Sequence, residues 1–216
     1  MSYETMVILS YSILPAAVAV VFKLRMIEQI YYPFVVCILT GFINELISTY
    51  LISNGYSNAT NNNVYSIIEA LLILYLFRQW GLFQLHTNIF YVISIVLIAT
   101  WTYEHRSIDK LGLFLPHFKL MASICIVAMS IITMNKMIIE HNFSLLKAPE
   151  FLCCTGFCLY FSTRILMEIF FYYGIDGNIG LQDAVFKSAS IINAVTNFLY
   201  LNAILWMPRK PKFIMQ

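Results

Sequence analysis

Charged residues are scarce in this sequence: Asp, Glu, Lys and Arg make up only 11% of its 216 residues, whereas 60% are hydrophobic. Soluble domains carry about 25% charged and about 45–50% apolar residues, so the composition excludes an ordinary soluble domain. A disordered or collagen-like chain is excluded as well. The composition therefore predicts an integral membrane protein.

An excess of charge of one sign is also lacking, since the formal net charge is only +2. A nucleic-acid partner is therefore not expected. The five cysteines all fall in apolar stretches, and their odd number fits neither a disulfide framework nor a zinc site. Glycine-rich phosphate loops and metalloprotease or hydrolase motifs are absent from the sequence too. We expect no catalytic residue, no metal site and no cofactor, which favours a protein other than an enzyme.

Long apolar segments are what the sequence has in abundance. Each can cross a hydrocarbon core about 30 Å thick at a helical rise of about 1.5 Å per residue. The sequence predicts an all-α fold: an integral membrane bundle of seven transmembrane helices as a single domain over 1–207, then a short basic tail over 208–216. The seven segments cover residues 5–22, 30–52, 63–79, 86–102, 111–134, 149–173 and 182–207.

The distribution of Lys and Arg orients this bundle. Cytoplasmic loops carry the excess of these residues, and eight of the 13 fall in one set of loops against two in the opposite set. We expect a multi-pass protein of the inner (plasma) membrane, surrounded by the lipid bilayer, with its N-terminus outside and its tail in the cytoplasm. The eight residues are Lys23, Arg25, Arg78, Lys136, Lys147, Arg209, Lys210 and Lys212.

Among the ionisable side chains within the apolar segments, five stand out: Glu45, Glu69, Arg164, Glu168 and Lys187. Each costs about 2.5–3.5 kcal/mol at mid-membrane, so each needs a partner or a polar cavity. In the orientation above, all five lie in the outer half of the membrane. Their convergence predicts one polar layer there.

Further polar residues belong to the same layer. Tyr65 precedes Glu69 by one helical turn, which places phenol and carboxylate on one face. Asn44 and Asn63 are expected to donate supporting hydrogen bonds. The predicted ligand-binding residues are Asn44, Glu45, Asn63, Tyr65, Glu69, Arg164, Glu168 and Lys187.

Two interpretations of this layer remain open. Buried salt bridges, for example Glu45–Arg164 and Glu69–Lys187, would hold the helices in register without any ligand. Alternatively, the charges line a pocket that opens to the outside and receives a small polar ligand, a cation or a proton. Three glutamates against one Arg and one Lys leave one carboxylate without a basic partner, which favours the pocket.

Several short motifs spread over nearly the whole chain carry a resemblance: Asn44-Glu45-Leu46-Ile47-Ser48, Asn54-Gly55-Tyr56, Asn61-Asn62-Asn63-Val64-Tyr65 with Glu69, and Ile204-Leu205-Trp206-Met207-Pro208. With these motifs the chain resembles a family of small bacterial seven-span proteins of unassigned function. More loosely, it is similar to the seven-helix sensor regions that precede bacterial signalling domains. The second resemblance implies stimulus sensing through the helix bundle.

These observations lead us to expect a ligand- or ion-sensing membrane protein whose outward-facing pocket relays to a membrane or cytoplasmic partner, such as a signalling protein at the basic tail. An alternative is a small-solute or proton-coupled transporter that uses the same charges. Pro33 and Pro149 both open the second helix of a three-helix group, as parallel repeats would. A second alternative is a structural membrane subunit with buried salt bridges.

Overall fold

A computed structural model describes residues 3–107, 116–140, 145–172 and 179–208. Throughout these residues the regular structure is helical, with no β-strand. The helices are α1 (Tyr3–Ser10), η1 (Tyr11–Ile13), α2 (Leu14–Lys23), η2 (Gln29–Tyr31), α3 (Tyr32–Ser53), α4 (Ala59–Gln79), α5 (Thr87–Ser107), α6 (Pro116–Glu140), η3 (Leu145–Lys147), α7 (Pro149–Tyr172) and α8 (Ile179–Trp206).

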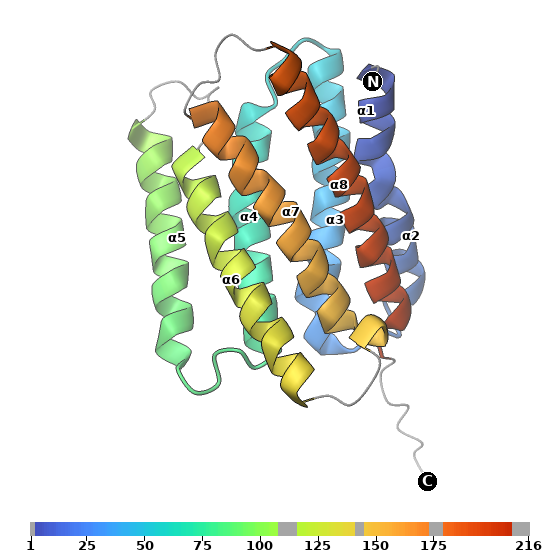
Figure 1. The fold of residues 1–216 in the computed structure, drawn as a ribbon, viewed down its shortest axis with the longest axis vertical. Coiled ribbons are helices and arrows are strands. Elements are labelled where there is room, and N and C mark those ends of the chain that lie inside the picture. Colours follow the sequence, from blue (N-terminus) through green and yellow to red (C-terminus); the bar gives the residue numbers. More distant parts are fainter. Residues whose placement is uncertain (1–2, 108–115, 141–144, 173–178, 209–216) are drawn as a thin grey trace.

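The helices form one antiparallel bundle (Figure 1). α1, η1 and α2 follow one another without a break and make a single rod, and α3 to α8 then alternate in direction. We call the end of the bundle where α1, α4, α6 and α8 begin the upper end, as it is drawn in Figure 1, and the opposite end the lower end. The first rod and α8 lie side by side, so the first and last helices of the described chain share one flank, while the chain begins at the upper end and leaves α8 at the lower end.

Four stretches of helix are long and apolar enough to cross a membrane: Gln29–Ser53, Pro116–Ile139, Pro149–Phe170 and Ala184–Trp206. α4 and α5 have 21 residues each, which matches the length of a membrane span, but polar residues at their ends lower their hydropathy. The first rod contains a shorter apolar helix over Ile8–Lys23.

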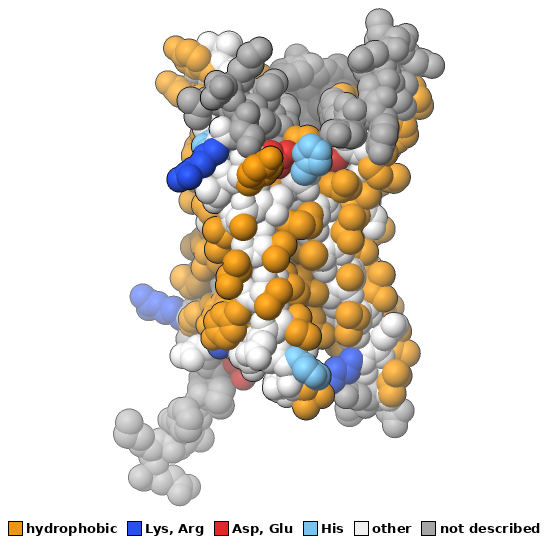
Figure 2. Space-filling model, turned by 90° about the vertical axis from the view of Figure 1, so that its left-hand side faces the viewer, with side chains coloured by type: hydrophobic (Ala, Val, Ile, Leu, Met, Phe, Trp, Pro, Cys, Tyr) orange, Lys and Arg blue, Asp and Glu red, His pale blue; other side chains and the backbone are white. Residues whose placement is uncertain are grey.

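The surface of the bundle is apolar around its middle. On the face that α5 forms, hydrophobic side chains cover the central part, while Lys, Arg and His side chains lie towards the two ends (Figure 2). Ile95 of α5 is 65% exposed and Val92 is 58% exposed. Exposed apolar area of this extent marks an interaction surface, and on long apolar helices that surface faces lipid. The fold therefore indicates a multi-pass membrane protein.

The seven predicted segments coincide with the helical rods within the described residues, but several boundaries differ. α4 begins at Ala59 rather than at residue 63, because the asparagines there lie within its first turns instead of in a loop. α5 continues to Ser107, so Glu104 lies inside a helix and not in the predicted loop. Residues 111–115 of the fifth segment and 209–216 of the tail lie outside the described residues.

Two glycines with left-handed backbone end α3 and α4. Gly55 has φ +74° and Gly81 has φ +80°, a region that residues with a Cβ rarely occupy. After Gly55, the N–H of Tyr56 donates to the carbonyl of Leu51 at 2.9 Å, which is the bond of a Schellman motif. These caps allow the short turns that keep α3, α4 and α5 antiparallel neighbours.

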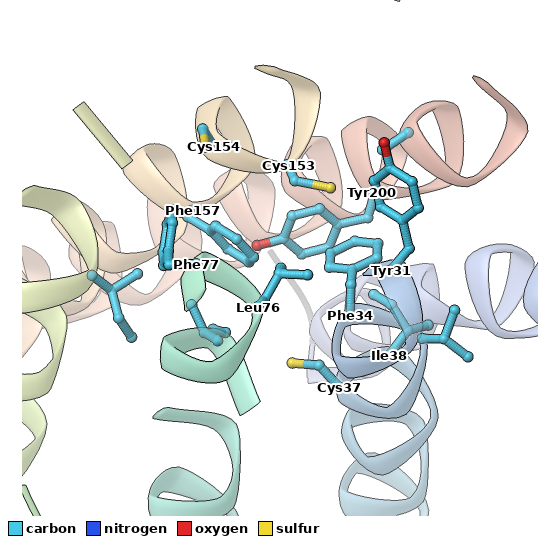
Figure 3. Packing of buried hydrophobic residues seen from close by; sticks show 14 of the residues in the cluster. Tyr31, Phe34, Cys37, Ile38, Leu76, Phe77, Cys153, Cys154, Phe157 and Tyr200 are labelled. Carbon is cyan, nitrogen blue, oxygen red and sulfur yellow. The ribbon is translucent and has the colours of Figure 1, made fainter. Parts of the chain in front are cut away.

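A layer of aromatic rings fills the lower half of the core (Figure 3). We call Phe34, Phe77, Phe157 and Tyr200 the aromatic layer; all four are buried. Phe34 and Tyr200 pack edge-on with centroids 5.3 Å apart, and the centroids of Phe77 and Phe157 are 6.0 Å apart. The layer joins α3, α4, α7 and α8, so it fixes the distance between these helices.

Gly156 of α7 allows Tyr200 to enter this layer, because a Cβ at position 156 would overlap Cε1 of the ring. We expect Gly156→Ala to displace the ring and to destabilise the protein by about 1–3 kcal/mol, as overpacking does. The measurement is the thermal unfolding midpoint in detergent. Leu159→Ala, at a 40% exposed position of the same helix, is the control and should shift the midpoint less. Equal shifts in the two variants would contradict the close contact.

Candidate functional site

A cavity of about 370 Å³, the upper cavity, runs down the interior of the bundle between the first rod, α3, α4, α7 and α8. Ile52 and Asn58 line it near the upper end, and Phe34, Phe157 and Tyr200 of the aromatic layer line its lower part. Sites for small molecules have volumes of about 300–1,000 Å³. The upper cavity therefore has room for a small ligand and is closed below by aromatic rings.

Four of the predicted site residues line this cavity: Asn44, Glu45, Tyr65 and Glu69. Asn44 and Glu45 come from α3, and Tyr65 and Glu69 lie one turn apart on α4. Residues four apart share a helical face, as the sequence spacing indicated. The cavity thus combines the polar faces of two neighbouring helices.

Glu69 lies at the centre of the polar contacts. Its Oε1 accepts a hydrogen bond of 2.9 Å from the Tyr65 hydroxyl, and its Oε2 accepts one of 2.8 Å from Nη1 of Arg164. The Glu69 side chain is only 7% exposed and that of Arg164 is 14% exposed. Gly41 leaves room for the Tyr65 hydroxyl beside α3. The pair is thus Glu69–Arg164, in place of the Glu45–Arg164 and Glu69–Lys187 bridges that the sequence suggested.

Glu45 is the other carboxylate of the cavity. It is half-buried and lies in hydrogen-bonding range of the Ser10 hydroxyl. Among the described residues, no Lys, Arg or His nitrogen lies within salt-bridge distance of it. A half-buried carboxylate that lacks a basic partner leaves a negative charge facing the cavity, unless it takes up a proton.

Amide and hydroxyl groups complete the polar wall. Nδ2 of Asn61 donates to Oδ1 of Asn44 at 2.8 Å and to Ser48 at 3.2 Å, which joins α3 to α4. Nδ2 of Asn197 donates to the Ser12 hydroxyl at 2.8 Å, which joins α8 to the first rod. These bonds hold the helices around the cavity, which Asn44, Ser48 and Asn197 also line.

A second group of charges lies behind α7, away from the cavity, and we call it the α6–α7 charge cluster: Glu104, Lys119, Arg164 and Glu168. Lys119 is only 2% exposed and interacts electrostatically with the other three. Glu104 accepts hydrogen bonds from the backbone N–H groups of His117 at 3.1 Å and Phe118 at 2.9 Å, so it caps the start of α6. Arg164 connects this cluster to Glu69.

The remaining predicted site residues do not line the upper cavity. Asn63 is buried on another side of α4, where its backbone carbonyl accepts a hydrogen bond of 3.0 Å from Nε1 of Trp101. Glu168 belongs to the α6–α7 charge cluster, and Arg164 reaches the site only through Glu69. Lys187 of α8 is half-buried and is not among the lining residues.

Other cavity residues were not among the predicted ligand-binding residues. Asn193 and Asn197 line the cavity from α8, where their four-residue spacing places both on one face of the helix. Tyr160 lines it from α7, and its position one turn before Arg164 was the available signal. Ser10 lines it from the first rod, where it is followed by the polar residues Tyr11 and Ser12, and that short polar stretch was the available signal.

Comparison with family models, with curated proteins and with solved structures finds no match to this chain. The resemblance to small bacterial seven-span proteins and to sensor regions therefore stays a prediction. The geometry of the cavity carries the functional argument instead.

The Glu69–Arg164 pair yields a prediction about the coupling between these two side chains. Removing one member leaves the other as a buried uncompensated charge, so Glu69→Gln and Arg164→Gln should each destabilise the protein by about 3–5 kcal/mol. The double variant should recover much of that loss. Thermal unfolding of all four proteins measures the coupling, and Arg106→Gln at an exposed position is the control. Additive losses in the double variant would show that the two side chains do not act as a pair.

Proposed function

We propose that the protein is a seven-span receptor of the inner membrane that binds a small cationic ligand or a cation in the upper cavity. The observation that carries this proposal is the contrast between the two cavity carboxylates. Arg164 neutralises Glu69, whereas Glu45 faces the cavity without a basic partner among the described residues. A cation in the cavity would supply that partner in a low-dielectric site, where the attraction is strong.

The proposed topology has residues 1–207 as one seven-span domain, with the N-terminus outside and the 208–216 tail in the cytoplasm. Five of the Lys and Arg residues that set this orientation are described, and they lie at the lower end of the bundle: Lys23, Arg25, Arg78, Lys136 and Lys147. An excess of basic residues favours the cytoplasmic side. The upper cavity then lies towards the outside.

The proposed relay passes through α8. This helix lines the upper cavity with Asn193 and Asn197 and contributes Tyr200 to the aromatic layer. At its lower end, Nζ of Lys23 donates to the carbonyl of Leu205 at 2.7 Å, which ties α8 to α2. A ligand that draws Glu45 and the α8 amides together would shift α8 against the first rod, and the basic tail that follows α8 is the expected contact for a signalling partner.

A cation-binding test follows from the unpaired carboxylate. We expect ammonium, methylamine or Na⁺ to raise the thermal unfolding midpoint of the wild-type protein, because a ligand at about 100 times its Kd adds about 2.7 kcal/mol of stability. Glu45→Gln should abolish the shift, whereas the matched variant Glu28→Gln, near the lower end, should keep it. If no cation shifts the wild type, or if both variants respond alike, Glu45 is a structural group and the receptor proposal fails.

The topology has its own test. Tyr56, in the turn after α3, is 65% exposed, and Leu85, in the turn before α5, is 92% exposed. In intact cells, a membrane-impermeant maleimide should label Tyr56→Cys and should label Leu85→Cys only after permeabilisation. The wild-type chain, whose five cysteines are buried or half-buried, reports the background. The reverse labelling pattern would invert the bundle and place the upper cavity in the cytoplasm.

A transporter is the second candidate, and a specific observation favours it. A second cavity, of about 640 Å³, lies at the lower end and shares no lining residue with the upper cavity. Alternating access opens a transporter to each side of the membrane in turn, and a cavity at each end of the bundle would provide the two openings. If the protein takes up methylamine into proteoliposomes in a saturable way, and if Glu45→Gln abolishes this uptake, the protein is a carrier and the receptor proposal is wrong.

A further inference from the structure

The second cavity, which we call the lower cavity, has walls of a different chemistry. It lies between η2, the end of α4, the lower part of α6, η3, the start of α7 and the end of α8. Two lysines line it, Lys136 from α6 and Lys147 from η3. Among the side chains that the structure describes, which do not include that of residue 140, no carboxylate lies within salt-bridge distance of either lysine. The lower cavity is therefore lined by two positive charges that lack a carboxylate partner there.

The one described carboxylate that lines this cavity, that of Glu150, already has a partner. The hydroxyl of Tyr31, which is itself buried, donates a hydrogen bond to Oε1 of Glu150. This bond holds Glu150 against η2. Even with Glu150 ionised, the two lysines leave a net positive charge on the cavity wall.

Trp80 provides the third observation. Its Nε1 is buried, and no acceptor within the described residues takes its hydrogen. Buried N–H groups nearly always have an acceptor, so each exception needs an explanation. Trp80 lines the lower cavity. Its N–H is covered in this conformation, and an anion towards which the indole ring turns would supply the acceptor that the described chain does not.

Two further features of the wall favour an anion. α7 begins at Pro149, which also lines the cavity, and the start of a helix carries partial positive charge on its free N–H groups. Lys147 lies with Nζ 5.4 Å from the ring centroid of Trp206, so the ring holds this lysine at the cavity edge.

We infer that the lower cavity binds a phosphate group, held by Lys136, Lys147 and the Trp80 indole N–H. The group belongs either to the headgroup of an anionic phospholipid or to free phosphate. Leu146 is 71% exposed and Ile139 is 83% exposed beside η3 and α6, as lipid-facing side chains are. An anionic lipid could therefore place its acyl chains on this surface and its phosphate in the cavity. The inference does not depend on the receptor proposal, which concerns the upper cavity only.

The experiment measures thermal unfolding of the full chain in detergent with three additives: phosphatidylglycerol, phosphatidylcholine and inorganic phosphate. The proteins are wild type, Lys136→Gln, Lys147→Gln and Trp80→Phe, with Arg25→Gln as the control, since Arg25 is an exposed cation of the lower end that does not line the cavity. We expect phosphatidylglycerol or inorganic phosphate to stabilise the wild type. Each lysine variant should weaken that binding about fivefold, as the loss of one cation near an anionic lipid does. Trp80→Phe should also weaken it, and Arg25→Gln should leave it unchanged.

The additives separate the two sources of the phosphate. Stabilisation by phosphatidylglycerol alone supports a lipid headgroup, and stabilisation by inorganic phosphate without lipid supports a free anion. Stabilisation by phosphatidylcholine as well means that any lipid suffices, and it overturns the inference. The inference is also overturned if neither phosphatidylglycerol nor inorganic phosphate stabilises the wild type, or if Lys136→Gln is stabilised as much as Arg25→Gln. Lys136 is exposed, so its variant should fold and decide the matter even if Trp80→Phe is unstable.

Discussion

A charge in the middle of an apolar bundle needs a counter-ion close by, and this requirement determines how the upper half of the protein is built. Arg164 of α7 meets Glu69 of α4 at 2.8 Å, with both side chains largely shielded from solvent. On its other side Arg164 faces Lys119 and Glu168, so one guanidinium connects the cavity wall to the α6–α7 charge cluster. Breaking the pair would expose each group to an apolar environment, which gives the bundle one strongly preferred register between α4 and α7.

The ion pair between Arg164 and Glu69 also determines the arrangement of the other polar residues at the cavity. Glu69 in turn orients the Tyr65 hydroxyl, and Gly41 lets that hydroxyl approach α3. Glu45, on the neighbouring helix, is left to face open volume. Among the described residues, the polar groups at the upper cavity therefore divide into an internally neutralised set and the carboxylate of Glu45, to which we assign the proposed ligand.

The sequence was sufficient to predict the helical rods, because hydropathy locates the apolar segments and their length is that of a helix that spans a membrane. It also predicted that Tyr65 and Glu69 share a face, because four-residue spacing determines a face of a helix. It did not predict which helix each face meets. Asn62 lines the cavity, whereas its neighbour Asn63 is buried against α5. Successive residues of a helix are rotated by about 100°, and the packing of the helices decides which of the two faces the cavity. The partner of Arg164 was open for the same reason, since several carboxylates lay at similar depth.

The two cavities differ in charge, and this difference bears on the choice between receptor and carrier. The upper wall combines amide groups with a carboxylate that has no basic partner among the described residues, whereas the lower wall combines two lysines with Trp80. A cation that moved from Glu45 to the lower cavity would meet Lys136 and Lys147 there, and an anion that moved upwards from the two lysines would meet Glu45. Only a zwitterion could bind well in both places. For a simple cation, this difference in charge supports the proposed receptor site above and the proposed anion site below as two separate sites.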